Sequence, residues 1–131
     1  MKKFFTILVL SLVVAFTANS CSAYDYNNDP NYVSVTNAQG VIYFNLRTVN
    51  VQEYNPPYYQ IAGWFVWTNG NSERHYEVVK RYNWNTKETY SRDEGYWRKD
   101  RTEYDDKASM RNRKHADALF RAAYGMDFYG Y

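Results

Sequence analysis

Between residues 32 and 104 the chain alternates apolar and polar side chains with a period of two, which is typical of strands in a half-buried sheet. In the segment 41–47, for example, Ile42, Phe44 and Leu46 share one side. Short runs rich in Asn, Asp, Gly and Pro separate such segments and predict turns. The pattern predicts about six antiparallel strands, at residues 32–36, 41–47, 58–68, 74–84, 86–92 and 96–104. Residues 48–53 either extend the second strand or connect it to the third.

The pattern changes to helical spacing at the C-terminal end. Residues 106–124 contain no Pro or Gly, and the apolar residues among them recur every three or four positions. Asp105 or Asp106 can cap the start of this helix, and Gly125 follows its end, where glycine is favoured. Because the strands precede the helix instead of alternating with it, we expect an α+β fold. The predicted architecture is an antiparallel meander of about six strands packed by one C-terminal helix.

The first 23 residues have the features of a bacterial signal peptide. Lys2 and Lys3 precede an uncharged apolar run from Phe4 to Phe16, and small residues follow up to Ala23. The run has roughly 13 residues, fewer than the about 20 that a membrane-spanning helix needs. Cleavage after Ala23 would release a secreted chain. Cleavage after Ser20 would leave Cys21 first, the position at which bacterial lipoproteins carry a lipid that tethers them to the membrane.

The mature chain is small and electrically balanced. Removal of residues 1–23 leaves 131 − 23 = 108 residues, with 16 − 2 = 14 Lys and Arg against 14 Asp and Glu. A net charge near zero argues against a nucleic-acid-binding protein. We expect a polar spacer over residues 24–31 and a single domain over residues 32–131. Cys21 is the only cysteine, so this domain has no internal disulfide.

Residues that could carry catalysis or bind a metal are few. His75 and His115 lie on different predicted elements, and no glycine-rich phosphate loop is present. Glu73, His75 and Glu77 would share one face of a strand and could ligate a metal. The alternative for these three residues is a solvated strand face with cross-strand pairs, and we favour it over the metal site. We therefore expect no enzymatic activity, no metal and no cofactor.

Two surfaces are candidates for binding. All 15 Tyr and 4 Trp lie beyond residue 23, which is more than a core of this size needs. The first candidate is therefore an aromatic face of the sheet, made of Tyr43, Tyr76, Tyr82, Trp84, Tyr96 and Tyr104. The second is a basic face of the helix that includes Arg111, Arg113 and Lys114, suited to an acidic protein or an envelope or matrix polymer. Formation of a homodimer through the aromatic face is an alternative use of these rings.

The layout also resembles a known family. The hairpin segment Val41-Ile42-Tyr43-Phe44-Asn45-Leu46, the lipoprotein-like signal and the closing helix together resemble the surface-adhesin protein E family. Tyr43-Phe44-Asn45-Leu46 stands where that family carries a Tyr-Tyr-Ile-Asp-like stretch, and residues 76–82 and 90–97 resemble its later strands. The resemblance covers residues 32–124, without the cysteines that tie sheet to helix in the family. It implies a surface protein that binds host or matrix macromolecules, as a monomer or a dimer, and has no catalytic residues.

The sequence thus predicts an exported bacterial protein of the periplasm, the cell surface or the extracellular space. Its expected function is that of an adhesin-like binding module that uses an aromatic-rich sheet face for macromolecular recognition. The alternative is a structural or inhibitor protein of the envelope that has no host ligand.

Overall fold

The computed structural model describes residues 24–37 and 39–130 and confirms the α+β class. The predicted signal peptide, both cleavage sites and Cys21 lie outside the described residues. The elements follow one another as η1 (Tyr26–Asn28), β1 (Tyr32–Asn37), β2 (Val41–Asn45), η2 (Leu46–Thr48), β3 (Asn50–Asn55), β4 (Tyr58–Thr68), β5 (Glu73–Asn83), β6 (Glu88–Asp93), β7 (Tyr96–Lys99) and α2 (Lys107–Tyr124), where η marks a short 3-10 helix.

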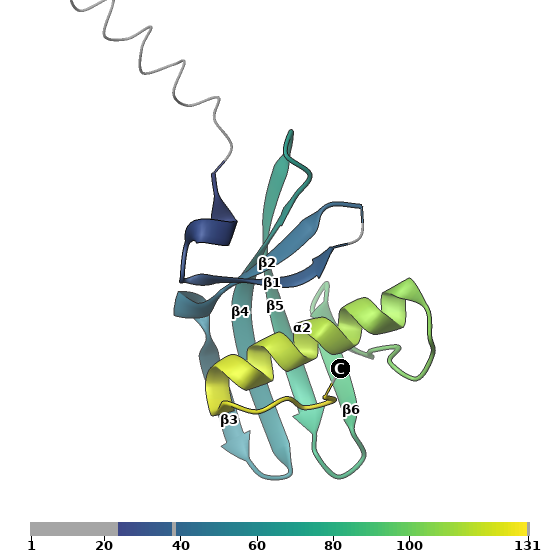
Figure 1. The fold of residues 1–131 in the computed structure, drawn as a ribbon. Helices are drawn as coiled ribbons and strands as arrows, with labels where there is room; N and C mark the ends of the chain where they lie inside the picture. Colours follow the sequence, from purple (N-terminus) through teal and green to yellow (C-terminus); the bar gives the residue numbers. More distant parts are fainter. Residues whose placement is uncertain (1–23, 38, 131) are drawn as a thin grey trace, which may run out of the picture.

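The strands form one antiparallel sheet in the order β1-β2-β4-β5-β6-β7, with β3 also paired to β4. The long strands β4 and β5 pair from Tyr58↔Asn83 to Thr68↔Glu73. The other edge of β4 is shared, since β2 pairs with residues 65–68 and β3 with residues 58–62. The β4–β5 hairpin extends past β6, which pairs with β5 only over residues 80–83 (Figure 1). No described strand pairs with residues 73–79 on that side, so the first half of β5 is a sheet edge.

Three strand boundaries differ from the prediction. Residues 50–55 form a separate strand, β3, because the turn η2 breaks the chain after β2. The fifth predicted strand begins at Glu88, since residues 84–87 form a turn in which Lys87 has a φ of 54°. The last strand ends at Lys99, because Asp100 turns inward to a buried partner.

Helix α2 lies across one face of the sheet (Figure 1). The core between them is made of nine buried residues: Ile42, Phe44, Ile61, Phe65, Tyr82, Ala116, Leu119, Phe120 and Phe128. Gly63 lets the helix approach β4 closely. A Cβ at this position would meet Leu119 Cδ2 at 2.8 Å and would come still closer to the ring of Phe44. The predicted apolar stripe of the helix is therefore the face that packs on the sheet.

Both predicted ends of the helix are confirmed. The Asp106 carboxylate accepts a hydrogen bond from the Ser109 N–H at 2.7 Å, which satisfies one of the free donors of the first turn. Gly125 has a φ of 75°, a left-handed conformation that glycine adopts without steric cost.

A second, smaller cluster covers part of the opposite face of the sheet. Tyr26 in η1 is 6% exposed and stacks on Tyr43, with ring centroids 5.1 Å apart. Its hydroxyl donates to Glu73 Oε1 at 2.7 Å. The segment 24–31, expected to act as a spacer, thus packs against the sheet, because Tyr26 buries its ring and still finds an acceptor for its hydroxyl.

The chain after α2 folds back along the helix (Figure 1). The buried carboxylate of Asp117 accepts hydrogen bonds from the backbone N–H groups of Phe128, Tyr129 and Gly130, at 3.0, 2.7 and 3.2 Å. These bonds hold the Phe128 ring in the core, where it is 2% exposed.

Candidate functional site

Four of the six aromatic residues predicted to form a binding face pack inside the fold instead. Tyr76, Tyr82 and Trp84 face α2 and belong to the core or its border. Tyr82 is 2% exposed, and its hydroxyl donates to the carbonyl of Ala116 at 2.8 Å. Tyr43 is buried on the opposite face of the sheet. These rings stabilise the fold, since a tyrosine can be buried when its hydroxyl has an acceptor.

The other two members of that set are exposed. Tyr96 begins β7 and is 79% exposed, and Tyr104 lies on the connection to α2 and is 55% exposed. The Arg101 guanidinium lies 4.4 Å from the centre of the Tyr104 ring. Because the six residues are divided among two sheet faces and a connecting segment, they do not form the contiguous aromatic face that we predicted.

The predicted basic residues of the helix do not form one patch either. Arg113 is 8% exposed and donates to the carbonyls of Thr102 and Tyr104, at 2.5 and 2.9 Å, so it anchors the segment before the helix. Arg111 and Lys114 line two different cavities.

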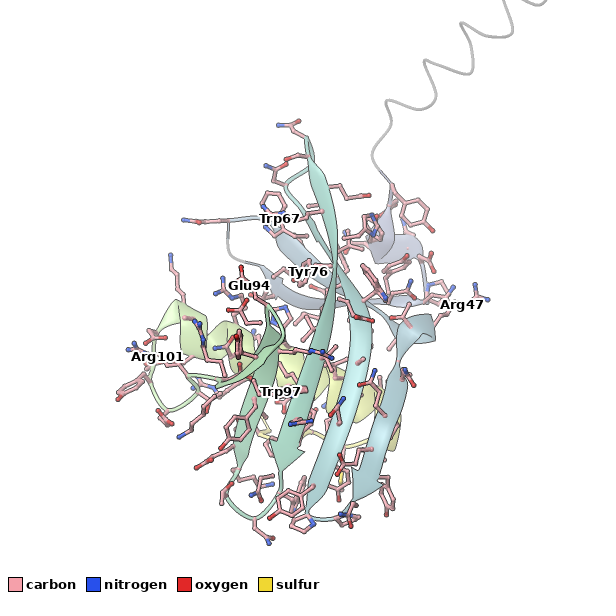
Figure 2. The ribbon with its side chains drawn as sticks, turned by 180° about the vertical axis from the view of Figure 1, so that it is seen from behind. Arg47, Trp67, Tyr76, Glu94, Trp97 and Arg101 are labelled. Atoms are coloured by element: carbon pink, nitrogen blue, oxygen red, sulfur yellow. The ribbon has the colours of Figure 1, made fainter. Side chains whose placement is uncertain are left out.

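The larger cavity, of about 490 Å³, lies beside the free edge of β5. Its walls come from residues 74–80 of β5, Ile42 of β2, the end of β4 at Trp67, the end of β6 and the first half of α2. Figure 2 shows the labelled side chains of Trp67 and Tyr76 along this part of the β4–β5 hairpin. Residues 76–80 all line the cavity, although neighbouring side chains on a strand point to opposite faces. The cavity therefore borders the backbone of β5 as well as its side chains.

Three arginines from three elements surround this cavity: Arg74 of β5, Arg92 of β6 and Arg111 of α2. All three are exposed, and none has a described carboxylate within ion-pair distance. Arginines elsewhere do have such partners, as in Arg101–Asp106 at 2.8 Å and Arg121–Asp127 at 2.7 Å. The cavity thus gathers three guanidinium groups without an ion-pair partner in the described chain, and Glu77 is the one acidic residue in its lining.

A buried ion pair closes one side of the cavity. Lys80 is 2% exposed, and its ammonium group donates to Asp100 Oδ2 at 2.6 Å and to Ser91 Oγ at 2.9 Å. The hydroxyls of Thr89 and Ser91 donate to the same carboxylate, at 2.9 and 2.8 Å. Burial lowers the pKa of Lys80, and the Asp100 charge opposes this shift. The network is satisfied within the protein, so Lys80 acts as a structural part of the cavity wall.

His115 and Tyr76 form a second polar pair at the cavity. The carbonyl of Arg111 can only accept, so its 2.7 Å contact places the proton of His115 on Nδ1. Nε2 then accepts the Tyr76 hydroxyl at 3.0 Å. Burial lowers the pKa of His115 to about 4 and raises the pKa of Tyr76 to about 12. At neutral pH the pair is uncharged, and both ring nitrogens are engaged.

The smaller cavity, of about 320 Å³, lies between β1 and α2. Its charged residues include Lys114, Asp117, Arg121 and Asp127, which carry both signs. Arg121 and Asp127 pair with each other. This cavity therefore lacks the uncompensated charge of the larger one.

Residues 24–37 and 39–130 contain no group of three His, Cys, Asp or Glu residues placed to hold a metal ion. On the strand face that was considered as a metal site, His75 Nε2 contacts Glu73 Oε2 at 2.8 Å. Within the same residues no helix has the length and apolar character needed to cross a membrane.

Comparison with known proteins gives no relative from which a role for this site could be inferred. No family model matches the chain, and no match was found among curated proteins or solved structures. The resemblance to the surface-adhesin protein E family therefore stays a prediction.

Sequence reasoning missed Arg74, Arg92 and Lys80 as residues of a site. One signal was present: Lys80 shares a strand face with Tyr76, Val78 and Tyr82, and a charge among apolar neighbours needs a buried partner. Nothing in the local sequence marks Arg74 or Arg92, because solvated arginines are common on strands.

Proposed function

We propose that this protein is a binding module that takes an anionic macromolecule into the cavity beside β5. The observation that carries the proposal is the set of three arginines, Arg74, Arg92 and Arg111, that line the cavity without carboxylate partners in the described chain. Guanidinium groups bind carboxylates, phosphates and sulfates through paired N–H donors. The proposal keeps the binding function expected from the sequence and moves the site from the aromatic face to this cavity.

The polar pairs of the cavity support a role in binding without catalysis. A general base at neutral pH needs a pKa near 7. His115 has a pKa of about 4 and Tyr76 one of about 12, and the two groups bond to each other. Lys80 is held by Asp100. We therefore assign these residues to the walls of the cavity and assign no reaction to them.

Replacing Arg74, Arg92 and Arg111 together by Gln is expected to weaken binding of two polyanionic probes, poly-glutamate and heparin, by at least about tenfold at low salt. Titration followed by tryptophan fluorescence measures this, because Trp67 lines the cavity. The matched control replaces Arg47, Arg98 and Arg121 by Gln, which removes the same charge outside the cavity. Equal losses in the two variants would show binding to net charge alone and contradict the proposal. Failure of the unmodified protein to bind either probe would favour a structural or inhibitor protein instead.

We further propose that the module is exported and acts in the periplasm, at the cell surface or outside the cell. The basis is the run of residues 1–23, with its two lysines, apolar segment and small residues. Mass spectrometry of the protein recovered from a bacterial host tests this. A chain beginning at Tyr24 indicates secretion, and a lipid on an N-terminal Cys21 indicates a membrane tether. An uncleaved chain in the cytoplasm would contradict export.

A further inference from the structure

We propose that the ligand of the cavity is an extended acidic polypeptide segment, which pairs as an added strand with the free edge of β5. The inference rests on the proposed function and goes further, because it names the class of ligand and its mode of binding. It follows from the hydrogen-bonding pattern of β5, the position of the cavity and the placement of the arginines.

The hydrogen-bonding pattern shows which backbone groups of β5 are free. The Trp84 N–H donates to the Pro57 carbonyl at 2.8 Å, and the Asn69 N–H donates to the Ser72 carbonyl at 3.3 Å. At both ends of β5, then, the even-numbered residues bond toward β4. Alternate residues of an antiparallel strand bond to opposite sides. The N–H and C=O groups of His75 and Glu77, and the N–H group of Val79, therefore point to the edge, where no described strand pairs with them.

An unpaired strand edge is a template for another extended chain. The cavity lies at this edge, because Glu77 and Val79 line it together with Tyr76 and Val78, whose side chains point to the other face. A chain lying in the cavity can therefore reach the free backbone groups and the arginines at the same time. Heparin or a free phosphate could satisfy the arginines but could not continue the strand ladder.

The arginines determine which residues the added strand should carry. Every second side chain of such a strand points to the cavity side of the sheet. There Arg74 and Arg111 lie on the two facing elements. Arg92 lines the cavity at the end of β6, but its side chain points to the opposite side, because its neighbour Ser91 faces Lys80. The intervening side chains point to the side of Glu77, which lies directly beside them on β5 and would repel a negative charge, whereas Arg92 on that side lies at the end of the free edge. The expected ligand thus has Glu or Asp at alternate positions, with uncharged residues between them.

Charge also argues against two other occupants. In a two-fold antiparallel pairing of β5 with a second copy, both sets of three arginines would lie in one interface, and like charges there oppose association. Residues 1–23 of the chain itself contain no Asp or Glu. A separate acidic polypeptide is the occupant that complements the cavity.

The test uses the heptapeptide Thr-Glu-Val-Glu-Thr-Glu-Val with blocked ends, titrated into the protein by calorimetry. Two analogues of the peptide are N-methylated at alternate residues, one at the odd-numbered positions and the other at the even-numbered positions. We expect the analogue that has lost the N–H donors facing β5 to bind at least about tenfold more weakly than the parent peptide. The other analogue, which keeps these donors, should bind nearly as well as the parent. Amide NMR signals of His75, Glu77 and Val79 should shift on binding.

A variant of the edge provides the matching test on the protein. Glu77→Pro removes one N–H that points away from β4, which an edge strand tolerates, and Glu77→Ala removes the same charge but keeps the N–H. We expect Glu77→Pro to weaken peptide binding at least about tenfold relative to Glu77→Ala, with heparin binding equal in the two. Equal melting temperatures confirm that both variants fold.

Three outcomes would overturn the inference. In the first, both N-methylated peptides bind the parent protein normally and Glu77→Pro binds the parent peptide normally, while the variant without Arg74, Arg92 and Arg111 does not bind it. The cavity then binds anions without strand pairing, and the proposed function stands. If the arginine variant also binds normally, the proposed function fails as well. If the unliganded protein is a dimer whose residues 75–79 are protected from amide exchange, a second copy occupies the edge.

Discussion

Replacing Asp100 by Ala should lower the free energy of unfolding by about 3–5 kcal/mol, because it leaves a buried ammonium group without its counter-charge. Lys80 is 2% exposed and its ammonium group lies 2.6 Å from the carboxylate, so water cannot easily replace Asp100. The hydroxyls of Thr89 and Ser91 would lose the same acceptor. Urea unfolding of the variant and the parent measures the difference.

Two controls separate the buried charge from other effects. The exposed pair Arg98–Asp93 has its charged atoms 3.7 Å apart, and Asp93→Ala should cost less than about 1 kcal/mol. The double variant Lys80→Met, Asp100→Ala should recover much of the stability lost in Asp100→Ala, because no unpaired charge remains. A double variant as unstable as Asp100→Ala alone would show that the loss comes from the hydroxyl network or from packing.

Replacing Phe120 by Ala should cost a similar amount, about 3–5 kcal/mol, because the ring is the centre of the aromatic core. Phe120 is 2% exposed, and its ring centroid lies 4.9–5.5 Å from those of Tyr59, Tyr82, Trp84, Tyr124 and Phe128. These five rings come from β4, β5, the turn after it, the end of α2 and the C-terminal segment. The cavity left by Ala could not be filled without moving several elements at once.

Urea unfolding also measures the loss of unfolding free energy in Phe120→Ala, with Phe120→Leu as the conservative control. Leu keeps most of the apolar volume, so it should cost clearly less than Ala. Tyr96→Ala, at an aromatic residue that is 79% exposed, should change stability by less than about 0.5 kcal/mol. A loss at Phe120 no larger than that at Tyr96 would contradict the assignment of the aromatic residues to the core.

The elements of the fold were predictable because they depend on local sequence. Alternation places Ile61 and Phe65 on one side of β4 whatever packs against them. Helix α2 begins after Asp106 and ends before Gly125, since a carboxylate can accept from the first turn and glycine adopts a positive φ. These are properties of short segments, and the structure reproduces them to within a few residues.

The roles of the aromatic residues were not predictable from the same pattern. Tyr82 and Tyr96 are the same residue type on predicted strands, yet one is buried and the other is largely exposed. The difference depends on where α2 lies across the sheet and on the carbonyl of Ala116 that accepts the Tyr82 hydroxyl. Periodicity shows which side of a strand a ring is on, but not what covers that side.

The sequence by itself therefore determined the strands, the helix with its caps, and the α+β class, because backbone conformation follows from the side chains of neighbouring residues. Only the tertiary structure decided that Lys80 pairs with Asp100, that Tyr26 covers the far face of the sheet, and that the cavity exists. Arg74, Arg92 and Arg111 come from three elements, and no local pattern links them. Their common position results from the early end of β6 beside the long strand β5, which is a property of sheet pairing between distant residues.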